Sequence, residues 1–297
     1  MLSILIPTYN YDVFSLVQSL HKQAIDSGKV FEILVFDDGS KDFIEENNKI
    51  NTLDNASYTV LDENIGRSAI RNLLAQEATY DTLLFLDADV AVLNDNFLMN
   101  YLEAITDETQ IIYGGIVYSE KSTDKDHVLR WVYGRQREAL PLGERLKNPY
   151  LRFLTLSFLI QKDVFKTISF NEEIPNLRHE DTLFAMDAKT NDINIQHIDN
   201  PVMHLGLETN DVFLRKSIES VVSLKLFVND GLINPDDVTL SRVAKRLSEN
   251  YISGIVLFFY KMFEPIMKRN LLSKKPSMFL FDLYRLGYYL KLKSKNR

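Results

Sequence analysis

The fold of this chain is decided by one stretch, Leu83-Leu84-Phe85-Leu86-Asp87-Ala88-Asp89-Val90. Its four bulky apolar residues follow one another without alternation, which is typical of a strand buried on both faces in a parallel sheet. In open α/β sheets, ligands bind just beyond the carboxyl ends of the strands, where Asp87 and Asp89 are expected to lie. In an extended segment, residues i and i+2 point the same way, so both carboxylates can face one cation. Such hard oxygen ligands suit Mg²⁺ or Mn²⁺, and a plain solvated strand end is the alternative.

Composition places the chain among ordinary globular proteins. It has 297 residues, of which 45% are hydrophobic and 25% charged, enough for one large α/β domain or two domains. It has no cysteine, which excludes disulfides, thiolate metal sites and cysteine nucleophiles and is compatible with a reducing compartment. The first residues, 1–7, resemble a strand and not a signal peptide, and the longest apolar run, 251–260, is too short to cross a bilayer.

The charge is unevenly distributed along the chain. Residues 251–297 hold ten Lys and Arg against two acids, a net charge of +8. Because the whole chain has a net charge of −7, the first 250 residues carry −15. This tail is also rich in aromatic residues. It could lie on an anionic membrane surface, or it could be a helical subdomain that packs on the body or on a second copy in a homodimer. Both interpretations stay open.

Apolar runs and turn residues predict the order of the elements. Strands are expected at 3–6, 31–36, 57–61 and 83–86, with helices between them, and the first strand is expected to stop at Pro7 because proline cannot continue a central ladder. This alternation predicts βαβ units and a mostly parallel sheet. Residues 119–149 have little periodicity and are predicted to form a loop-rich excursion. A helical C-terminal region is predicted beyond about residue 210, giving domains 1–210 and 211–297.

Four separate segments place carboxylates or an imidazole at predicted strand ends or loop starts. They are Asp37-Asp38, Asp87-Ala88-Asp89, Glu180-Asp181 and His204. Because the carboxyl ends of parallel strands meet at one edge of a sheet, we expect these segments to share one crevice.

The first 90 residues resemble a known family. Ile4-Leu5-Ile6-Pro7-Thr8-Tyr9-Asn10, Asp37-Asp38-Gly39-Ser40, Asn64-Ile65-Gly66 with Ala69-Ile70-Arg71-Asn72, and Phe85-Leu86-Asp87-Ala88-Asp89 occur in the order seen in family 2 inverting glycosyltransferases. The resemblance covers about residues 1–205. It implies the GT-A fold, a Rossmann-like, mostly parallel central sheet with helices on both faces.

The resemblance also implies a nucleotide site. Pro7 and Tyr9 would line the base pocket, and Asp38 would accept a hydrogen bond from the base. Arg67 and Arg71 lie one helical turn apart, and one of them would approach the base or the diphosphate. For Asp38 the alternative is an ordinary turn, and for Arg67 it is a solvated helix face.

A metal site is implied next to the nucleotide. Asp87 would lie near the ribose and the ion, and Asp89 would be the more direct ligand of Mn²⁺ or Mg²⁺. His204 would complete the coordination, although a histidine on an apolar segment is more often an ordinary core residue.

The catalytic base is implied at the start of a later helix. Asp181 would take the proton of the acceptor hydroxyl, and Glu180 would orient it or bind the sugar. His179 is a second candidate. Otherwise the two carboxylates simply favour a helix N-terminus.

Taken together, the resemblance implies a metal-dependent inverting glycosyltransferase that uses a nucleotide sugar, with UDP as the expected nucleotide. The acceptor would be a hydroxyl of a glycan or lipid-linked molecule in surface polysaccharide assembly, on the cytoplasmic side and at the inner face of the membrane. The sequence lacks the Gln-x-x-Arg-Trp signature of processive synthases, so a single addition is expected. There are two alternatives to this function: a nucleotidyltransferase, and a degenerate relative that binds nucleotide sugar without catalysis. The acidic body disfavours a nucleic-acid partner.

Overall fold

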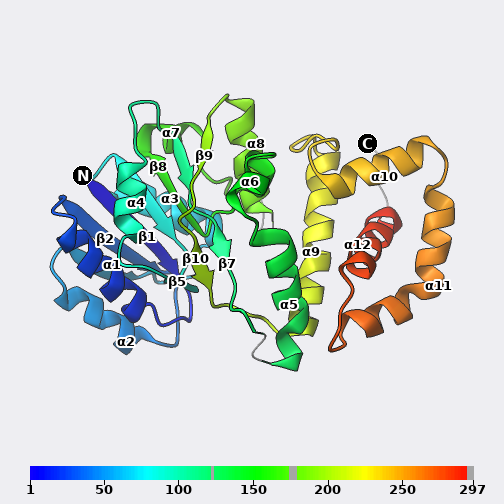
Figure 1. The fold of residues 1–297 in the computed structure, drawn as a ribbon, viewed down its shortest axis with the longest axis horizontal. Coiled ribbons are helices and arrows are strands. Elements are labelled where there is room, and N and C mark those ends of the chain that lie inside the picture. Colours follow the sequence, from blue (N-terminus) through cyan, green and yellow to red (C-terminus); the bar gives the residue numbers. More distant parts are fainter. Residues whose placement is uncertain (122–123, 174–178, 293–297) are drawn as a thin grey trace. The chain divides into compact units, whose positions relative to one another are not determined.

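A computed structural model describes residues 1–121, 124–173 and 179–292 of the chain (Figure 1). Its strands are β1 (Leu2–Thr8), β2 (Phe31–Asp37), β3 (Ala56–Val60), β4 (Thr82–Leu86), β5 (Val90–Val92), β6 (Ile111–Tyr113), β7 (Ile116–Val117), β8 (Ser157–Gln161), β9 (Ile195–His197) and β10 (Val202–His204). Its α-helices are α1 (Phe14–Asp26), α2 (Ile44–Asn48), α3 (Arg67–Glu77), α4 (Phe97–Glu103), α5 (Val128–Tyr133), α6 (Leu142–Arg145), α7 (Lys162–Thr167), α8 (Glu180–Thr190), α9 (Asn210–Asn229), α10 (Thr239–Glu249), α11 (Ser253–Leu271) and α12 (Met278–Lys291).

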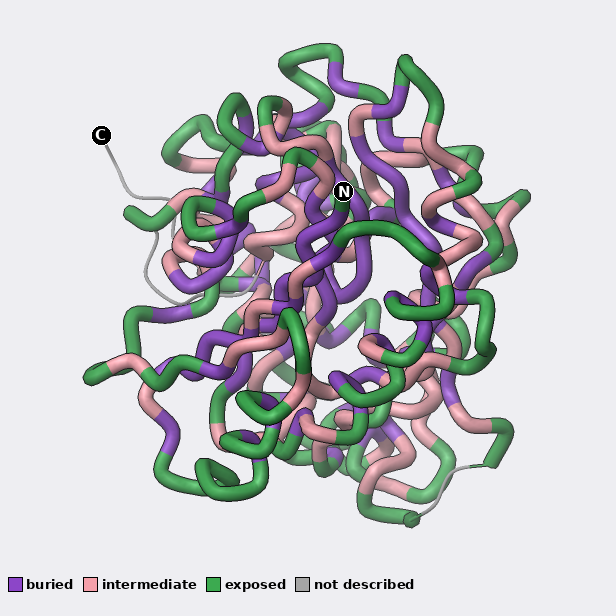
Figure 2. Tube along the Cα trace, turned by 90° about the vertical axis from the view of Figure 1, so that its left-hand side faces the viewer, coloured by how far each residue is buried: buried purple, intermediate pink, exposed green. Residues whose placement is uncertain are grey.

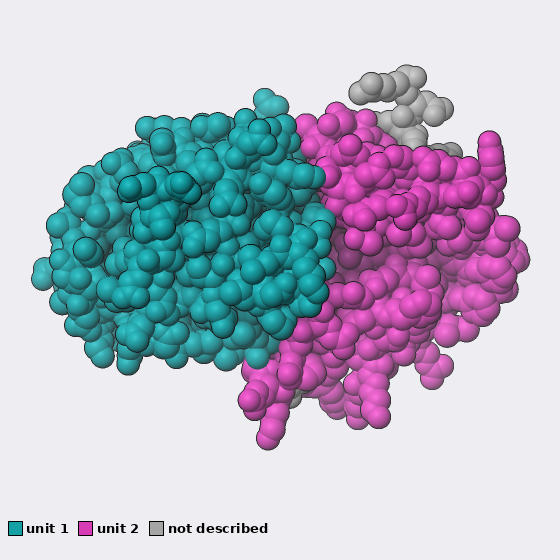
Figure 3. All heavy atoms as spheres, turned by 45° about the horizontal axis from the view of Figure 1, so that its top comes forward, with its two compact units in different colours: residues 1–118, 139–176, 180–206 teal, residues 119–138, 177–179, 207–297 magenta. Residues whose placement is uncertain are grey.

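The described residues form two compact units (Figure 3). The first, the α/β unit, contains residues 1–118, 139–176 and 180–206, and the second, the helical unit, contains 119–138, 177–179 and 207–297. The division of the chain into domains at about residue 210 stays a prediction.

The α/β unit is built on a sheet whose strands run in the order β3-β2-β1-β4-β8-β6-β9 among the described residues. The pairs β2–β3, β1–β2, β1–β4 and β6–β9 are parallel, and only β8 runs antiparallel to its neighbours β4 and β6. A smaller sheet has the order β5-β10-β7. The predicted fold class, a mostly parallel α/β sheet with C-terminal helices, is thus confirmed.

The first strand extends two residues beyond its predicted end, so the prediction that it stops at Pro7 is wrong. Pro7 pairs with Phe36 in β2, whereas pairing with β4 ends at Leu5. The backbone N–H of Asp38 donates to the carbonyl of Thr8, so Thr8 faces β2. Pro7, one residue earlier, faces the side on which the ladder has already ended, and its missing N–H leaves no partner unsatisfied.

Both faces of the large sheet are buried, as the unbroken apolar run predicts. Figure 2 marks the buried segments of the chain in purple. Leu5 and Phe85 point into a cluster with the helices α3 and α8, and Phe85 stacks on Phe158 with 5.0 Å between ring centroids. Ile4 alternates with Leu5 and is fully buried on the opposite face. Helix α1 packs against β2 and β5. The apolar layers on both faces fix the carboxyl edge of the sheet, where the acidic residues lie.

The prediction of a loop-rich excursion over 119–149 is wrong, because this segment folds into short helices. They are α5, α6, the 3-10 turn η2 (Lys125–His127) and the π-helical turn η3 (Gly134–Glu138). Helix α5 packs against α9, and the N–H of Leu129 donates to Asn210 Oδ1 at 2.7 Å. Six residues of helix with a single buried side chain, Leu129, leave little periodicity in the sequence.

The helical unit has a separate core around α11 and α12. Tyr260, Met267 and Leu271 of α11 are buried there with Phe281 and Tyr284 of α12. None of the helices in the described ranges is both long and apolar enough to cross a bilayer.

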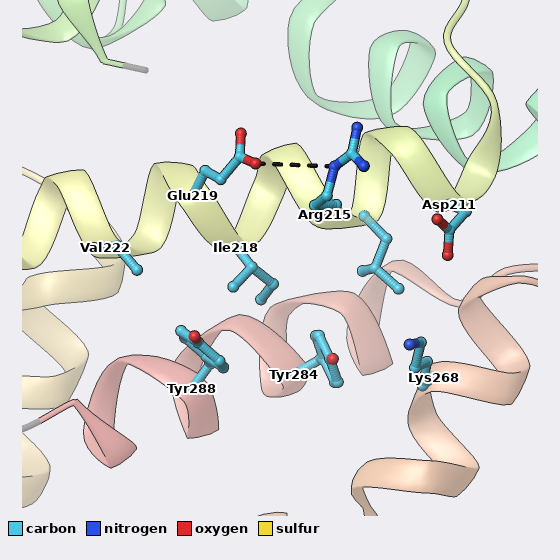
Figure 4. A pocket seen from close by; sticks show the side chains of 9 residues that line it. Asp211, Arg215, Ile218, Glu219, Val222, Lys268, Tyr284 and Tyr288 are labelled. Atoms are coloured by element: carbon cyan, nitrogen blue, oxygen red, sulfur yellow. Dashed lines mark ion pairs between the residues drawn. The ribbon is translucent and has the colours of Figure 1, made fainter. Parts of the chain in front are cut away.

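A cavity of about 300 Å³ lies in this unit between α9, α11 and α12 (Figure 4). Ile218 and Val222 of α9 and Tyr284 and Tyr288 of α12 line it, and Lys268 of α11 reaches it from the other end. Lys268 therefore lies on the side of α11 that faces α9 and α12.

Candidate active site

The turn after β2 is held by its two aspartates. Asp37 is fully buried and accepts hydrogen bonds from the N–H of Ser40 at 2.8 Å and from the hydroxyl of Tyr58 at 2.5 Å. Asp38 is 5% exposed, and its two carboxylate oxygens accept from the N–H groups of Ile65 at 2.7 Å and Gly66 at 3.0 Å. Asp38 therefore ties the turn after β2 to the loop that starts α3. Its role in base recognition stays a prediction.

We expect Asp38→Asn to loosen this tie, because the two N–H groups are accepted by different carboxylate oxygens and asparagine replaces one of these oxygens with an NH2 group that cannot accept. The unpaired group costs about 1–3 kcal/mol, so amide hydrogen exchange in residues 62–66 should speed up roughly ten-fold or more. Hydrogen exchange followed by mass spectrometry measures it, with the exposed Asp42→Asn as the control. Unchanged exchange in 62–66 would contradict the structural role of Asp38.

Two arginines on α3 connect two of the predicted site segments. The guanidinium of Arg71 is buried, donates to Asp87 Oδ1 at 2.5 Å and lies over the ring of Phe170. Arg67, one turn earlier, pairs with Glu180 Oε1 at 3.3 Å. The i, i+4 spacing predicted from the sequence thus places Asp87 of the β4 end and Glu180 of α8 along one helix face.

The pKa values of the two carboxylates at the start of α8 are shifted in opposite directions. Burial alone would raise the pKa of Glu180, but the Arg67 and Arg71 guanidinium groups outweigh it and hold this pKa below its usual range. Burial raises the pKa of Asp181 to about 7, and the neighbouring charge of Glu180 adds to the rise. One carboxylate is therefore a fixed anion and the other can exchange a proton near neutral pH.

Asp87 and Asp89 have different partners. The chain turns at Ala88 and Asp89, so the extended geometry expected for the i and i+2 positions is not formed. Asp87 binds Arg71, whereas Asp89 Oδ2 lies 3.4 Å from His204 Nε2.

Asp89 and His204 are brought together by the small sheet. β10 runs antiparallel to β5, with His204 opposite Val90, and the N–H of Leu205 donates to the carbonyl of Asp89 at 2.8 Å. Gly206 completes the contact, because a Cβ at that position would lie 2.1 Å from Asp89 Oδ2. Only a glycine leaves room for the carboxylate here.

This pair fits a divalent ion that is shared with a substrate. Among the described residues, no group of three His, Asp or Glu side chains is placed to hold a metal by itself. Mn²⁺ and Mg²⁺ commonly take only one or two protein ligands and complete their shells with water and substrate phosphates. Asp89 and His204 offer such a partial set.

We expect Gly206→Ala to displace the Asp89 carboxylate while the fold is retained, because the atom it meets is the end of a flexible side chain. Mn²⁺-dependent nucleotide binding should weaken about ten-fold or more. Calorimetric titration with UDP and Mn²⁺ measures it. Gly143→Ala is the matched control, since its Cβ would meet no atom within 4 Å. Equal affinities in the two variants would contradict the role of Gly206.

The remaining predicted residues lie at the end of β1. Pro7 is partly buried within the strand and the side chain of Tyr9, just after it, is 55% exposed. Their contact with a nucleotide base stays a prediction. The sequence reasoning missed Tyr11, whose pKa is raised by burial and next by the negative charge of Asp89. Its place shortly after β1, at the same sheet edge, is the signal that could have indicated it.

Comparison with known proteins identifies the family of this chain. The protein-family model described as "Glycosyl transferase family 2" matches residues 3–169, which is more than half of the chain. An uncharacterized glycosyltransferase of Haemophilus influenzae is 24% identical over 194 residues, which are 63% of this chain and 71% of the relative.

Three solved structures share the fold. Staphylococcus aureus TarS has a TM-score of 0.52 and 20% identity over 75% of this chain, which spans only 39% of the TarS chain. The mannosyltransferase PcManGT from Pyrobaculum calidifontis, solved with GDP-Man and Mn²⁺, has a TM-score of 0.57 and 11% identity over 97% of this chain and 85% of its own. Glucosyl-3-phosphoglycerate synthase from Mycobacterium tuberculosis, solved with Mn²⁺, UDP and phosphoglyceric acid, has a TM-score of 0.52 and 15% identity over 75% and 77%.

The family match confirms the resemblance carried by the motifs of the first 90 residues, and the solved structures confirm the fold. The chain belongs to glycosyl transferase family 2, whose members transfer a sugar from a nucleotide-sugar donor.

Proposed function

We propose that this chain is an inverting, metal-dependent transferase that adds a single sugar from a UDP-linked donor to a hydroxyl group of a glycan or lipid-linked acceptor. The observation that carries the proposal is the pair at the start of α8, in which the pKa of Asp181 is raised to about 7 beside the fixed anion Glu180. A base with a pKa near the working pH combines a useful ionised fraction with a strong drive for proton transfer.

In the proposed reaction the acceptor hydroxyl oxygen forms a bond to the anomeric carbon of the donor sugar. The bond from that carbon to the phosphate oxygen breaks on the opposite face, and the nucleoside diphosphate leaves with the bonding electrons. Asp181 takes the hydroxyl proton, so no covalent enzyme intermediate is needed. Arg67 keeps Glu180 ionised, and the negative charge of Glu180 in turn keeps Asp181 a strong enough base.

The donor diphosphate would bind beside Asp89 and His204. A Mn²⁺ or Mg²⁺ ion held by these residues would neutralise charge on the diphosphate as it leaves. PcManGT and glucosyl-3-phosphoglycerate synthase were both solved with Mn²⁺ and a nucleotide, which supports this assignment. The donor nucleotides of these two relatives differ, so UDP is the first and GDP the second to test.

The test is the release of nucleoside diphosphate from a panel of UDP and GDP sugars, with and without Mn²⁺ and with added acceptor sugars. We expect one donor to be consumed only with metal, and turnover to be lost in Asp181→Asn but retained in Asp187→Asn. Asp187 is a matched control because it is a partly buried carboxylate on the same helix. If a donor binds but wild type and variants release nothing with any acceptor, a binding protein without catalysis is supported instead.

A further inference from the structure

Helix α11 of the helical unit is apolar on two opposite sides. One side is buried: Tyr260, Met267 and Leu271 pack in the core with α12. The other side, here called the outer face of α11, carries six exposed apolar residues. They are Ile255, Phe258, Phe259, Met262, Phe263 and Ile266, with exposed fractions from 42% to 63%.

These six residues form one continuous stripe. With 3.6 residues per turn, Ile255, Phe258 or Phe259, Met262 and Ile266 follow one another on one side of the helix. The rings of Phe258 and Phe259 are 5.6 Å apart, and those of Phe259 and Phe263 are 6.4 Å apart. A helix that is apolar all round is normally covered on all sides, and a grouped exposed patch marks an interaction surface.

The surroundings of the outer face are positively charged. Besides Lys268, which lines the cavity, the exposed basic residues on α11 and in the turn that follows it are Lys261, Arg269, Lys274 and Lys275. The only acid on α11, Glu264, is half-buried and lowers the acidity of the inward-facing Tyr260, whose pKa is raised by burial and by that charge. The acid of α12, Asp282, is paired with Arg137 at 2.5 Å. Glu264 and Asp282 are thus two acids against four exposed basic residues beside the outer face, which leaves this region with a net positive charge.

We propose that the outer face of α11 binds the surface of an anionic lipid bilayer. The aromatic and aliphatic side chains would enter the boundary between headgroups and acyl chains, and the basic side chains would lie among the headgroups. Charge decides between lipid and a second copy of the chain. A two-fold contact would bring together the same positively charged surface of both copies, Lys261 and Arg269 included, and like charges would oppose that contact.

Vesicle sedimentation with the full-length protein tests this directly. We expect binding to phosphatidylcholine vesicles that contain about 30 mol% phosphatidylglycerol, and none to phosphatidylcholine alone. A triple variant of the outer face, F258S with M262S and I266S, should bind at least ten-fold more weakly. Its matched control replaces three apolar residues of the α/β unit that are 40–58% exposed, in I25S with V30S and V60S.

A second variant tests the contribution of the basic residues. K261Q with R269Q and K275Q should weaken binding roughly 100-fold, since each basic residue near such a surface contributes about five-fold in affinity. The control K22Q with K29Q and K49Q removes three exposed lysines of the α/β unit and should bind like the wild type. Circular dichroism confirms that all four proteins are folded.

Three results would overturn the proposal. They are no binding to anionic vesicles, equal binding to neutral vesicles, and unchanged binding of the outer-face variant. A dimer in light scattering that the outer-face variant dissolves, without lipid binding by the wild type, would assign the surface to a second copy instead. No donor or acceptor is present in these assays, so their outcome is independent of the proposed transfer reaction.

Discussion

Asp181→Asn is expected to lower the turnover number for sugar transfer about 10²- to 10⁴-fold, the usual contribution of a general base. Asparagine has nearly the shape of aspartate but cannot accept the proton of the acceptor hydroxyl. Donor affinity should change little, because the proposed diphosphate partners are Asp89 and His204. Turnover and donor affinity are measured separately by nucleoside diphosphate release and by calorimetry. A variant that turns over like the wild type would remove Asp181 from the role of base.

The pH dependence provides a second readout of the same residue. The base acts in its ionised form, and its pKa is about 7, so kcat/KM should rise with pH and level off above this value. Glu180→Gln removes the charge that adds to the rise in the pKa of Asp181, so the rising limb should move to lower pH. The limb should not vanish, because burial is the larger cause. A limb that stays in place in Glu180→Gln would show that another group is titrating.

Stability separates a catalytic from a structural role for Asp181. An aspartate in an unfolded chain has a pKa near 3.9, so the folded state binds more protons than the unfolded state between about pH 4 and 7. This carboxyl therefore makes the protein less stable as the pH rises through that window. Asp181→Asn cannot ionise, so its melting temperature relative to the wild type should increase from pH 5 to pH 8. A loss of melting temperature at pH 8 would instead indicate a structural role.

Strands β1, β2 and β4 of the α/β unit could be predicted because each is a compact apolar run with a polar end. Asp37 and Asp87 were placed correctly at strand ends for this reason, and so was the start of α8 at Glu180. The helices within 119–149 could not be predicted, since α5 is stabilised mainly by its contact with α9 and not by its own pattern. The end of β1 was predicted too early, at Pro7, because the sequence does not show which side of a strand lacks a neighbouring strand.

The partners within the site were less accessible to sequence reasoning than its members. Asp38 accepts hydrogen bonds from the N–H groups of Ile65 and Gly66, which lie 27 and 28 residues further along the chain. The motif around Asp38 does not predict these partners. Arg67 and Glu180 are separated by 113 residues. The family resemblance named members of the site, but the pairs that set their charges follow from the packing of α3 and α8.

Asp89→Asn is expected to weaken UDP binding in the presence of Mn²⁺ by about 10- to 100-fold or more, the second of the two large effects. The amide keeps one oxygen but loses the charge that a hard divalent ion requires. With a chelator in place of the metal, wild type and variant should bind UDP equally, which separates loss of the ion from loss of the nucleotide pocket. Titration calorimetry with UDP in Mn²⁺ and in chelator measures both.

The controls for this experiment come from the same part of the chain. Asp95→Asn changes an exposed carboxylate in the loop after β5 and should bind like the wild type under both conditions. His204→Ala removes the partner that lies 3.4 Å from Asp89, and a shared ion predicts the same loss only when Mn²⁺ is present. If both variants lost affinity equally in chelator, the pair would hold the pocket together and not a metal. If the wild type bound UDP equally with and without Mn²⁺, the ion would have no part in donor binding, and Asp89 and His204 would remain an ordinary pair between two short strands.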